Sequence, residues 1–317
     1  MKILANDGIS ISGIAALEKG GFEVINTNVA QEQLENYIND NSIDAILVGP
    51  TTQVRQELIE ACPSIKLIGK AGADLDTIDV DFARENGVHV IHTTEATANA
   101  IAELVFAHLF GMVRFLHQSN RDMPLEGDSR FNALKKQYAA GTELKGKTLG
   151  IIGTDSAANE VAKIAIGIGM NVLFVTDNAE EKNITLNFYN GQSISFTPET
   201  VSLQEVLKKS DFITLHVSNQ NEYVIGTQEL SNMKDGSGII NVSYGGALDE
   251  IALVNAIEDG KIKYAALDVF ENQPTPEIQL LMNPEISFTP HIGSSTIEAK
   301  AKIDLELAKQ LIELLSE

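Results

Sequence analysis

Short apolar runs alternate along the chain with longer segments in which apolar residues recur every three or four positions. Runs such as Ala45–Val48 and Thr148–Ile152 are typical of buried strands, and segments such as Ser10–Lys19 are typical of amphipathic helices. Strands and helices of this kind follow one another from Lys2 to the last helix. This regular alternation predicts an α/β protein with parallel sheets covered by helices on both faces.

Three segments depart from the alternation. Apolar residues fall at helical spacing from Thr97 to Leu116, which predicts one long amphipathic helix that could bridge two domains and contact a second subunit. The following segment, 119–146, is polar and irregular and is predicted to be a loop or arm. A closing helix is expected over residues 297–315, and it can return to the first domain.

An antiparallel insertion is expected near the middle of the chain. Apolar and polar residues alternate on both sides of Asn190-Gly191, and an Asn-Gly pair between two alternating runs is a strong hairpin signal. The hairpin is therefore predicted to interrupt an otherwise parallel pattern.

Residues 148–177 read as strand, turn, helix, strand, with Thr176-Asp177 at the end of the second strand. This order, with an acidic residue where a nucleotide ribose is bound, is typical of the first unit of a dinucleotide-binding fold. The turn begins with Gly153, but Asp155 occupies the second glycine position of the Gly-x-Gly-x-x-Gly pattern. A side chain and a negative charge then lie at a helix N-terminus that favours anions, so phosphate binding is expected to be weakened.

Composition narrows the classes of function. The 317 residues are enough for two domains, and the net charge of −21 argues against nucleic acid and anionic membranes as partners. No apolar run reaches the roughly 18 residues that a membrane span requires. A single cysteine, Cys62, and an N-terminus unlike a secretory signal lead us to expect a cytoplasmic protein.

Four stretches resemble one family when taken together and in order: 144–153, 211–216, 266–274 and 290–296. They resemble the D-isomer-specific 2-hydroxyacid dehydrogenases, in particular the D-3-phosphoglycerate dehydrogenases. The resemblance implies two Rossmann-like doubly wound parallel-sheet domains with a cleft between them. A substrate domain would comprise residues 1–97 and 292–317. An NAD-binding domain would comprise residues 98–291, with the hairpin inserted at 183–197.

The same resemblance implies hydride exchange between NAD and C2 of a 2-hydroxy or 2-oxo acid, usually in a homodimer. The catalytic histidine of the family corresponds to His291. The glutamate that partners it is replaced by Gln273, and the arginine that binds the substrate is replaced by Tyr244. A phenol offers one neutral donor where a guanidinium offers two charge-assisted ones. Losing such a donor typically lowers the rate by about 10²–10³.

Further positions are carried over from the family by motif. The cofactor-binding set comprises Gly153, Asp155, Ser156, Ala157, Thr176, Asp177, His216, Ser218 and Asp268, and the substrate-binding set comprises Lys70, Asp74 and His92. The acidic residues and histidines around the expected cleft match no metal-ligand spacing, so no metal is expected.

Two hypotheses for the function remain open. The first is an NAD-dependent oxidoreductase of the phosphoglycerate dehydrogenase type, impaired at its catalytic and phosphate-binding positions. The second is a catalytically inactive pseudoenzyme that serves as a binding or scaffold protein, because the replaced residues gather at cofactor and substrate positions while the core-forming residues are kept.

Overall fold

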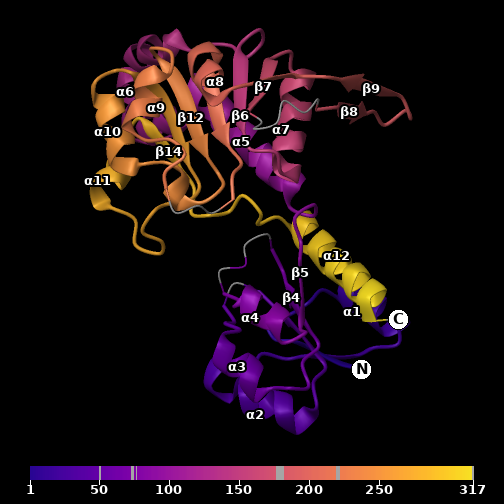
Figure 1. The fold of residues 1–317 in the computed structure, drawn as a ribbon. Coiled ribbons are helices and arrows are strands. Elements are labelled where there is room, and N and C mark those ends of the chain that lie inside the picture. Colours follow the sequence, from indigo (N-terminus) through magenta and orange to yellow (C-terminus); the bar gives the residue numbers. More distant parts are fainter. Residues whose placement is uncertain (50, 73–74, 76, 176–181, 219–221, 316–317) are drawn as a thin grey trace. The chain divides into compact units, whose positions relative to one another are not determined.

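The computed structural model describes residues 1–49, 51–72, 75, 77–175, 182–218 and 222–315 (Figure 1). The chain forms two compact units, Met1–Thr97 with Ser294–Glu317, and Ala98–Gly293. Each unit contains one parallel sheet with helices on both faces. The α/β class expected from the alternation of strands and helices is therefore confirmed.

The first unit has a five-stranded parallel sheet in the order β2-β1-β3-β4-β5. Its strands are β1 (Lys2–Ala5), β2 (Glu23–Asn26), β3 (Ala45–Val48), β4 (Leu67–Lys70) and β5 (His89–His92), and its helices are α1 (Ile11–Lys19), α2 (Gln31–Asn41), α3 (Gln56–Ala61), α4 (Val80–Glu85) and α12 (Ile297–Leu315). Successive residues of one strand face opposite cores. Ile3 packs with Leu307 and Leu311 of α12, whereas Leu4 packs with Leu34 of α2.

The second unit has a seven-stranded parallel sheet in the order β10-β7-β6-β11-β12-β13-β14. Its strands are β6 (Thr148–Ile152), β7 (Asn171–Val175), β10 (Glu199–Val201), β11 (Phe212–Leu215), β12 (Ser237–Asn241), β13 (Ile262–Leu267) and β14 (Ile286–Phe288). Its helices are α5 (Ala98–Val113), α6 (Leu116–Gln137), α7 (Ser156–Gly167), α8 (Leu203–Lys209), α9 (Thr227–Asn232), α10 (Glu250–Glu258) and α11 (Ile278–Leu281), with short 3-10 turns at Tyr138–Ala140 and Gly245–Ala247. One core joins α5 and α7 to the sheet, and a second joins α8, α9 and α10 to the other face.

The predicted hairpin is confirmed. Strands β8 (Ile184–Asn187) and β9 (Ser193–Phe196) pair antiparallel and extend from the second unit as a separate two-stranded sheet (Figure 1). Ile184 at its base is buried, whereas Ile194 and Phe196 are exposed. Thr185 and Ser195 face each other across the strands, with their hydroxyl oxygens 2.9 Å apart. The hairpin thus has an apolar face, which is buried only near its base, and a polar face.

The loop predicted for residues 119–146 is wrong, because most of it belongs to the helix α6. Leu134 is its only buried residue among those described, so the helix lacks the apolar stripe that would reveal it in the sequence. Pro124 and Gly127 within it are also poor helix formers. Arg130 has non-helical angles (φ −125°, ψ 22°) and marks a kink. The preceding helix α5 ends at Val113, three residues before the predicted end.

No single helix of the described residues is both long and apolar enough to cross a membrane. Helices α5 and α6 reach that threshold only as a joined pair, and that pair is bent by 56°. Most of α5 is buried in the core of its unit, as expected for a core helix.

Candidate functional site

The turn after β6 is built around Gly153. Its φ of +115° is a conformation that residues with side chains rarely adopt. A Cβ at this position would lie 1.7 Å from the carbonyl oxygen of His216. The His216 N–H in turn donates to the carbonyl oxygen of Ile152 at 2.7 Å. The turn therefore packs directly against the end of β11, and only glycine fits there.

Asp155 caps the N-terminus of α7. Its Oδ1 accepts a hydrogen bond from the Ala158 N–H at 2.7 Å, and its side chain is half-exposed. Burial of the carboxylate raises the pKa of Asp155, although the hydrogen bond to Ala158 and the charge of Lys182 act in the opposite direction. The chain's own carboxylate thus uses a backbone donor and the positive end of the helix dipole, which would otherwise be available to a ligand phosphate.

The remaining predicted cofactor-binding residues lie in α7, after β7 and after β11 in the sequence. Ser156 is half-buried in the first turn of α7, and Ala157 is buried. Thr176 and Asp177, predicted to bind the ribose, lie outside the described residues. Ser218 follows β11 and is exposed.

Lys182 is a site residue that the sequence did not reveal. Its Nζ donates to the carbonyl oxygen of Thr154 at 3.1 Å and to Oδ1 of Asn159 at 3.0 Å. It also lies 5.0 Å from the centre of the Phe174 ring. Burial lowers the pKa of Lys182, while the charge of Asp155 acts to raise it. A cation is thus held against the Gly153 turn, close enough to Asp155 for their charges to interact.

His216 is buried beneath the same turn. Its Nε2 lies 3.0 Å from the hydroxyl oxygen of Thr214, and its Nδ1 lies 3.9 Å from Oδ1 of Asp155. Burial lowers the pKa of His216 to about 3, so the ring is neutral at physiological pH. It supports the turn as a neutral side chain.

The structure brings together two of the three predicted catalytic residues. His291 and Gln273 are both exposed, with Nδ1 of the histidine 3.1 Å from Oε1 of the glutamine. His291 has a left-handed backbone (φ +55°), and its N–H donates to the carbonyl oxygen of Asp268 at 2.8 Å. Gln273 therefore takes the position of a partner that orients the imidazole ring.

Tyr244, the third predicted catalytic residue, lies after β12 and is half-buried against the core on the α8–α10 side. Its carbonyl oxygen accepts a hydrogen bond from Nδ2 of Asn241 at 2.9 Å. A Cβ on the next residue, Gly245, would lie 2.0 Å from the carbonyl oxygen of Phe270. The Tyr244 loop is thereby packed against the segment that follows β13 and leads to Gln273.

Asp268 is almost fully buried, and both of its carboxylate oxygens accept hydrogen bonds. Oδ1 accepts from the Thr289 hydroxyl at 2.6 Å and from the Ile292 N–H at 2.9 Å, and Oδ2 accepts from the Gly293 N–H at 2.8 Å. Its observed contacts hold the loop that carries His291. Its predicted contact with a cofactor stays a prediction.

Two of the three predicted substrate-binding residues lie at the ends of neighbouring strands, where Lys70 of β4 pairs with His92 of β5. Lys70 is fully buried, and its Nζ donates to the Gly49 carbonyl oxygen and the Thr77 hydroxyl, both at 2.8 Å. Asp74 lies outside the described residues.

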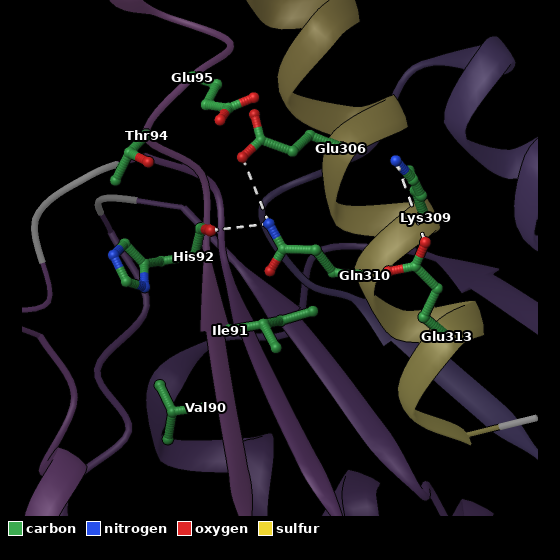
Figure 2. A pocket seen from close by; sticks show the side chains of 9 residues that line it. All are labelled: Val90, Ile91, His92, Thr94, Glu95, Glu306, Lys309, Gln310 and Glu313. Carbon is green, nitrogen blue, oxygen red and sulfur yellow. Dashed lines mark hydrogen bonds and ion pairs between the residues drawn. The ribbon is translucent and has the colours of Figure 1, made fainter. Parts of the chain in front are cut away.

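His92 lines a groove of about 450 Å³ between the edge of β5 and α12 (Figure 2). Gln310 reaches across from α12, and its Nε2 donates to the His92 carbonyl oxygen at 3.1 Å. Glu95 and Glu306 lie at the same end of the groove. Among the described residues, no group of three or more histidine, cysteine or acidic side chains is arranged to hold a metal ion.

Comparison with known proteins gives a consistent family. The model of the D-isomer specific 2-hydroxyacid dehydrogenase NAD binding domain matches residues 106–293. A hydroxypyruvate reductase of Thermotoga maritima is 34% identical over 93% of this chain and 92% of its own length. A D-3-phosphoglycerate dehydrogenase of Methanocaldococcus jannaschii is 32% identical over 99% of this chain, which spans only 57% of that relative. The crystal structure of a glyoxylate reductase from Paecilomyes thermophila matches with a TM-score of 0.79 and 30% identity, covering 98% of this chain and 93% of that one. The chain therefore belongs to the D-isomer specific 2-hydroxyacid dehydrogenase family.

Proposed function

We propose that this chain is a 2-hydroxyacid dehydrogenase-type protein whose dinucleotide binding and hydride-transfer activity are strongly weakened. The Ala98–Gly293 unit would bind a nicotinamide dinucleotide, and the other unit would contribute to binding a small 2-hydroxy or 2-oxo acid. The observation that carries the proposal is the Asp155 carboxylate, which accepts the Ala158 N–H at 2.7 Å. A ligand phosphate at this turn would have to displace that carboxylate or tolerate its charge.

His291 would exchange a proton with the substrate oxygen through Nε2, because Nδ1 lies 3.1 Å from Oε1 of Gln273. The nicotinamide, when bound, would supply or accept the hydride. The Gln273 amide oxygen can accept a hydrogen bond from Nδ1–H and so orient the ring. Being neutral, it stabilises the imidazolium less than a carboxylate would. We expect the proton transfer at His291 to be slowed as a result.

Tyr244 would face the substrate with a single neutral donor where the family has an arginine. One phenol hydroxyl cannot bind a carboxylate through two charge-assisted hydrogen bonds. With both replacements present, we expect activity lower by about 10³-fold or more than in a protein carrying the arginine and the glutamate, from the typical cost of such donors and acid–base groups.

A pseudoenzyme is the second candidate, and the coincidence of Asp155, Gln273 and Tyr244 favours it. Tyr244 replaces a positive group, and Gln273 replaces a catalytic carboxylate. Asp155 occupies a backbone donor that would otherwise be open. All three lie at positions where the family binds its ligands or carries out the reaction. The two candidates differ in whether any turnover remains.

The test is a fluorescence titration of NADH and of NADPH against the purified chain, followed by assays for reduction of glyoxylate and hydroxypyruvate and oxidation of 3-phosphoglycerate. The comparison variant combines Asp155→Gly, Tyr244→Arg and Gln273→Glu. We expect the variant to bind NADH at least tenfold more tightly, an energy of about 1.4 kcal/mol, and to show turnover that the parent lacks or nearly lacks. Tight NADH binding with rapid turnover by the parent would refute the proposed weakening. A detectable but slow turnover by the parent would exclude the pseudoenzyme.

We further propose that the chain forms a homodimer and acts in the cytoplasm. Phe110 of α5 and Leu116, Leu125 and Phe131 of α6 are exposed apolar side chains, an arrangement suited to a subunit contact. Light scattering coupled to size-exclusion chromatography tests the dimer, and a monomer at micromolar concentration would refute it.

A further inference from the structure

A chain of polar side chains connects helix α5 to the loop that carries His291. His108 lies on α5 and is buried; its Nδ1 lies 2.9 Å from the hydroxyl oxygen of Ser287, and its Nε2 lies 3.1 Å from the hydroxyl oxygen of Thr289. The Thr289 hydroxyl donates to Oδ1 of Asp268 at 2.6 Å. His108 and Asp268 are almost fully buried, and buried polar groups are costly unless each one has a partner.

The directions of these hydrogen bonds follow from the chemistry of the groups. A hydroxyl has one hydrogen, and that of Thr289 is given to the Asp268 carboxylate, which can only accept. The Thr289 oxygen must then accept from His108, so Nε2 carries the ring hydrogen. Burial lowers the pKa of His108, which keeps the ring neutral and leaves Nδ1 as an acceptor for the Ser287 hydroxyl.

At the Asp268 end of this series of hydrogen-bonded side chains, the backbone of His291 is held in an unfavourable conformation. His291 has a φ of +55°, in the left-handed region that is unfavourable for a residue with a side chain. Three successive N–H groups, those of His291, Ile292 and Gly293, donate to the carbonyl and carboxylate oxygens of Asp268 at 2.8, 2.9 and 2.8 Å. The carboxylate must be held at one place and in one orientation for these bonds to form together.

We propose that His108 is a positioning residue for His291: it holds the Asp268 carboxylate through the Thr289 hydroxyl and thereby fixes the backbone of residues 291–293. Whether this positioning matters for proton transfer at His291 rests on the function proposed above. The positioning itself does not, because it concerns a loop of the free protein.

The test measures amide hydrogen exchange at Ile292 and Gly293 by NMR in the full chain, without cofactor. In His108→Leu and Thr289→Val, we expect these two amides to exchange about five- to tenfold faster, the loss typical of one hydrogen bond. His108→Gln should restore slow exchange, because its side-chain N–H can still donate to Thr289. Ser210→Ala is the matched control, since the buried Ser210 hydroxyl has no hydrogen-bond partner among the described residues.

A second readout is the tautomer of His108, which long-range proton–nitrogen spectra identify directly. We expect the hydrogen on Nε2. A hydrogen on Nδ1, or unchanged exchange at Ile292 and Gly293 in both Thr289→Val and His108→Leu, would overturn the proposal. Faster exchange throughout the second unit, with no excess at these two amides, would also overturn it, because the variants would then act only on global stability. None of these outcomes depends on whether NADH binds.

Discussion

Buried His216 should make the stability of the second unit fall steeply below neutral pH. The ring lies under the Gly153 turn with Nε2 3.0 Å from the Thr214 hydroxyl oxygen, and burial lowers its pKa to about 3. In the unfolded chain the pKa returns to about 6.5. Between these two values the unfolded state binds a proton that the folded state does not. The free energy of unfolding therefore rises with pH through this window and is lost as the pH falls.

The size of the effect follows from the two pKa values. Lowering the pH from 7 to 5 should cost about 2 kcal/mol through this group, at roughly 1.4 kcal/mol per pH unit once the unfolded histidine is charged. Asp155, 3.9 Å away, acts in the opposite direction. Its pKa is raised in the folded state, so the folded protein takes up a proton there first as the pH falls. The stabilisation from Asp155 therefore acts at the acid end of the pH range between the folded and unfolded pKa values of His216.

The assay is urea unfolding at constant ionic strength between pH 5 and pH 7.5, followed by amide signals of β6 and β11. His216→Gln keeps an uncharged polar side chain but removes the titration. Because other histidines titrate in both proteins, the difference between the two pH profiles isolates His216. We expect the parent to lose about 2 kcal/mol more than the variant between pH 7 and pH 5. Parallel profiles would show that His216 is not held neutral by burial.

Three further changes test individual contacts. Gly153→Ala should lower the free energy of unfolding by at least about 3 kcal/mol, because its Cβ would meet the His216 carbonyl oxygen. The control Gly146→Ala, with φ +76° but no heavy atom of the described residues within 4 Å, should cost only about 1–2 kcal/mol. Equal losses in the two variants would refute the steric argument. Asp155→Asn should keep the helix cap and strengthen NADH binding, whereas Asp155→Ala should lower the free energy of unfolding in urea by about 1 kcal/mol. Unchanged NADH affinity in Asp155→Asn would show that the charge of Asp155 is not what weakens NADH binding. Ile184→Ala at the buried base of the hairpin should lower the free energy of unfolding by about 2–4 kcal/mol. Ile194→Ala, at an exposed position, should lower it by less than about 0.5 kcal/mol. Thermal unfolding measures both variants, and similar losses would contradict the packing described.

Both parallel sheets could be predicted from the sequence because strands buried on two faces are apolar at nearly every position. The hairpin could be predicted from Asn190-Gly191, since few turns other than a tight hairpin use that pair so often. Strand β10 was missed because only Val201 of its three residues is buried. Helix α6 was missed for the related reason that it buries almost nothing.

Motifs located the candidate site along the chain but not its contacts in space. Gly153 and Asp155 follow from the strand–turn–helix pattern, and the N-cap geometry agrees with an acidic residue before a helix. Lys182 carries no local signal, because its place beside the turn depends on contacts with Thr154 and Asn159, which are distant in the sequence. The hydrogen bonds that the His291 loop donates to Asp268 depend on β13 and β14 being neighbours, which the order of strands along the chain does not state.

Helix α12 completes the unit that begins at the N-terminus, and this has a consequence for synthesis on the ribosome. Leu307 and Leu311 belong to the same core as Ile3 and Leu17. Translation must continue for roughly 200 residues after Thr97 before they appear, which takes about 10–40 s at common rates. During that interval one face of the first sheet is covered by α1 but not by α12, while the other unit can finish folding. Chaperones that bind nascent apolar segments would therefore be expected to engage residues 1–97 for longer than residues 98–293.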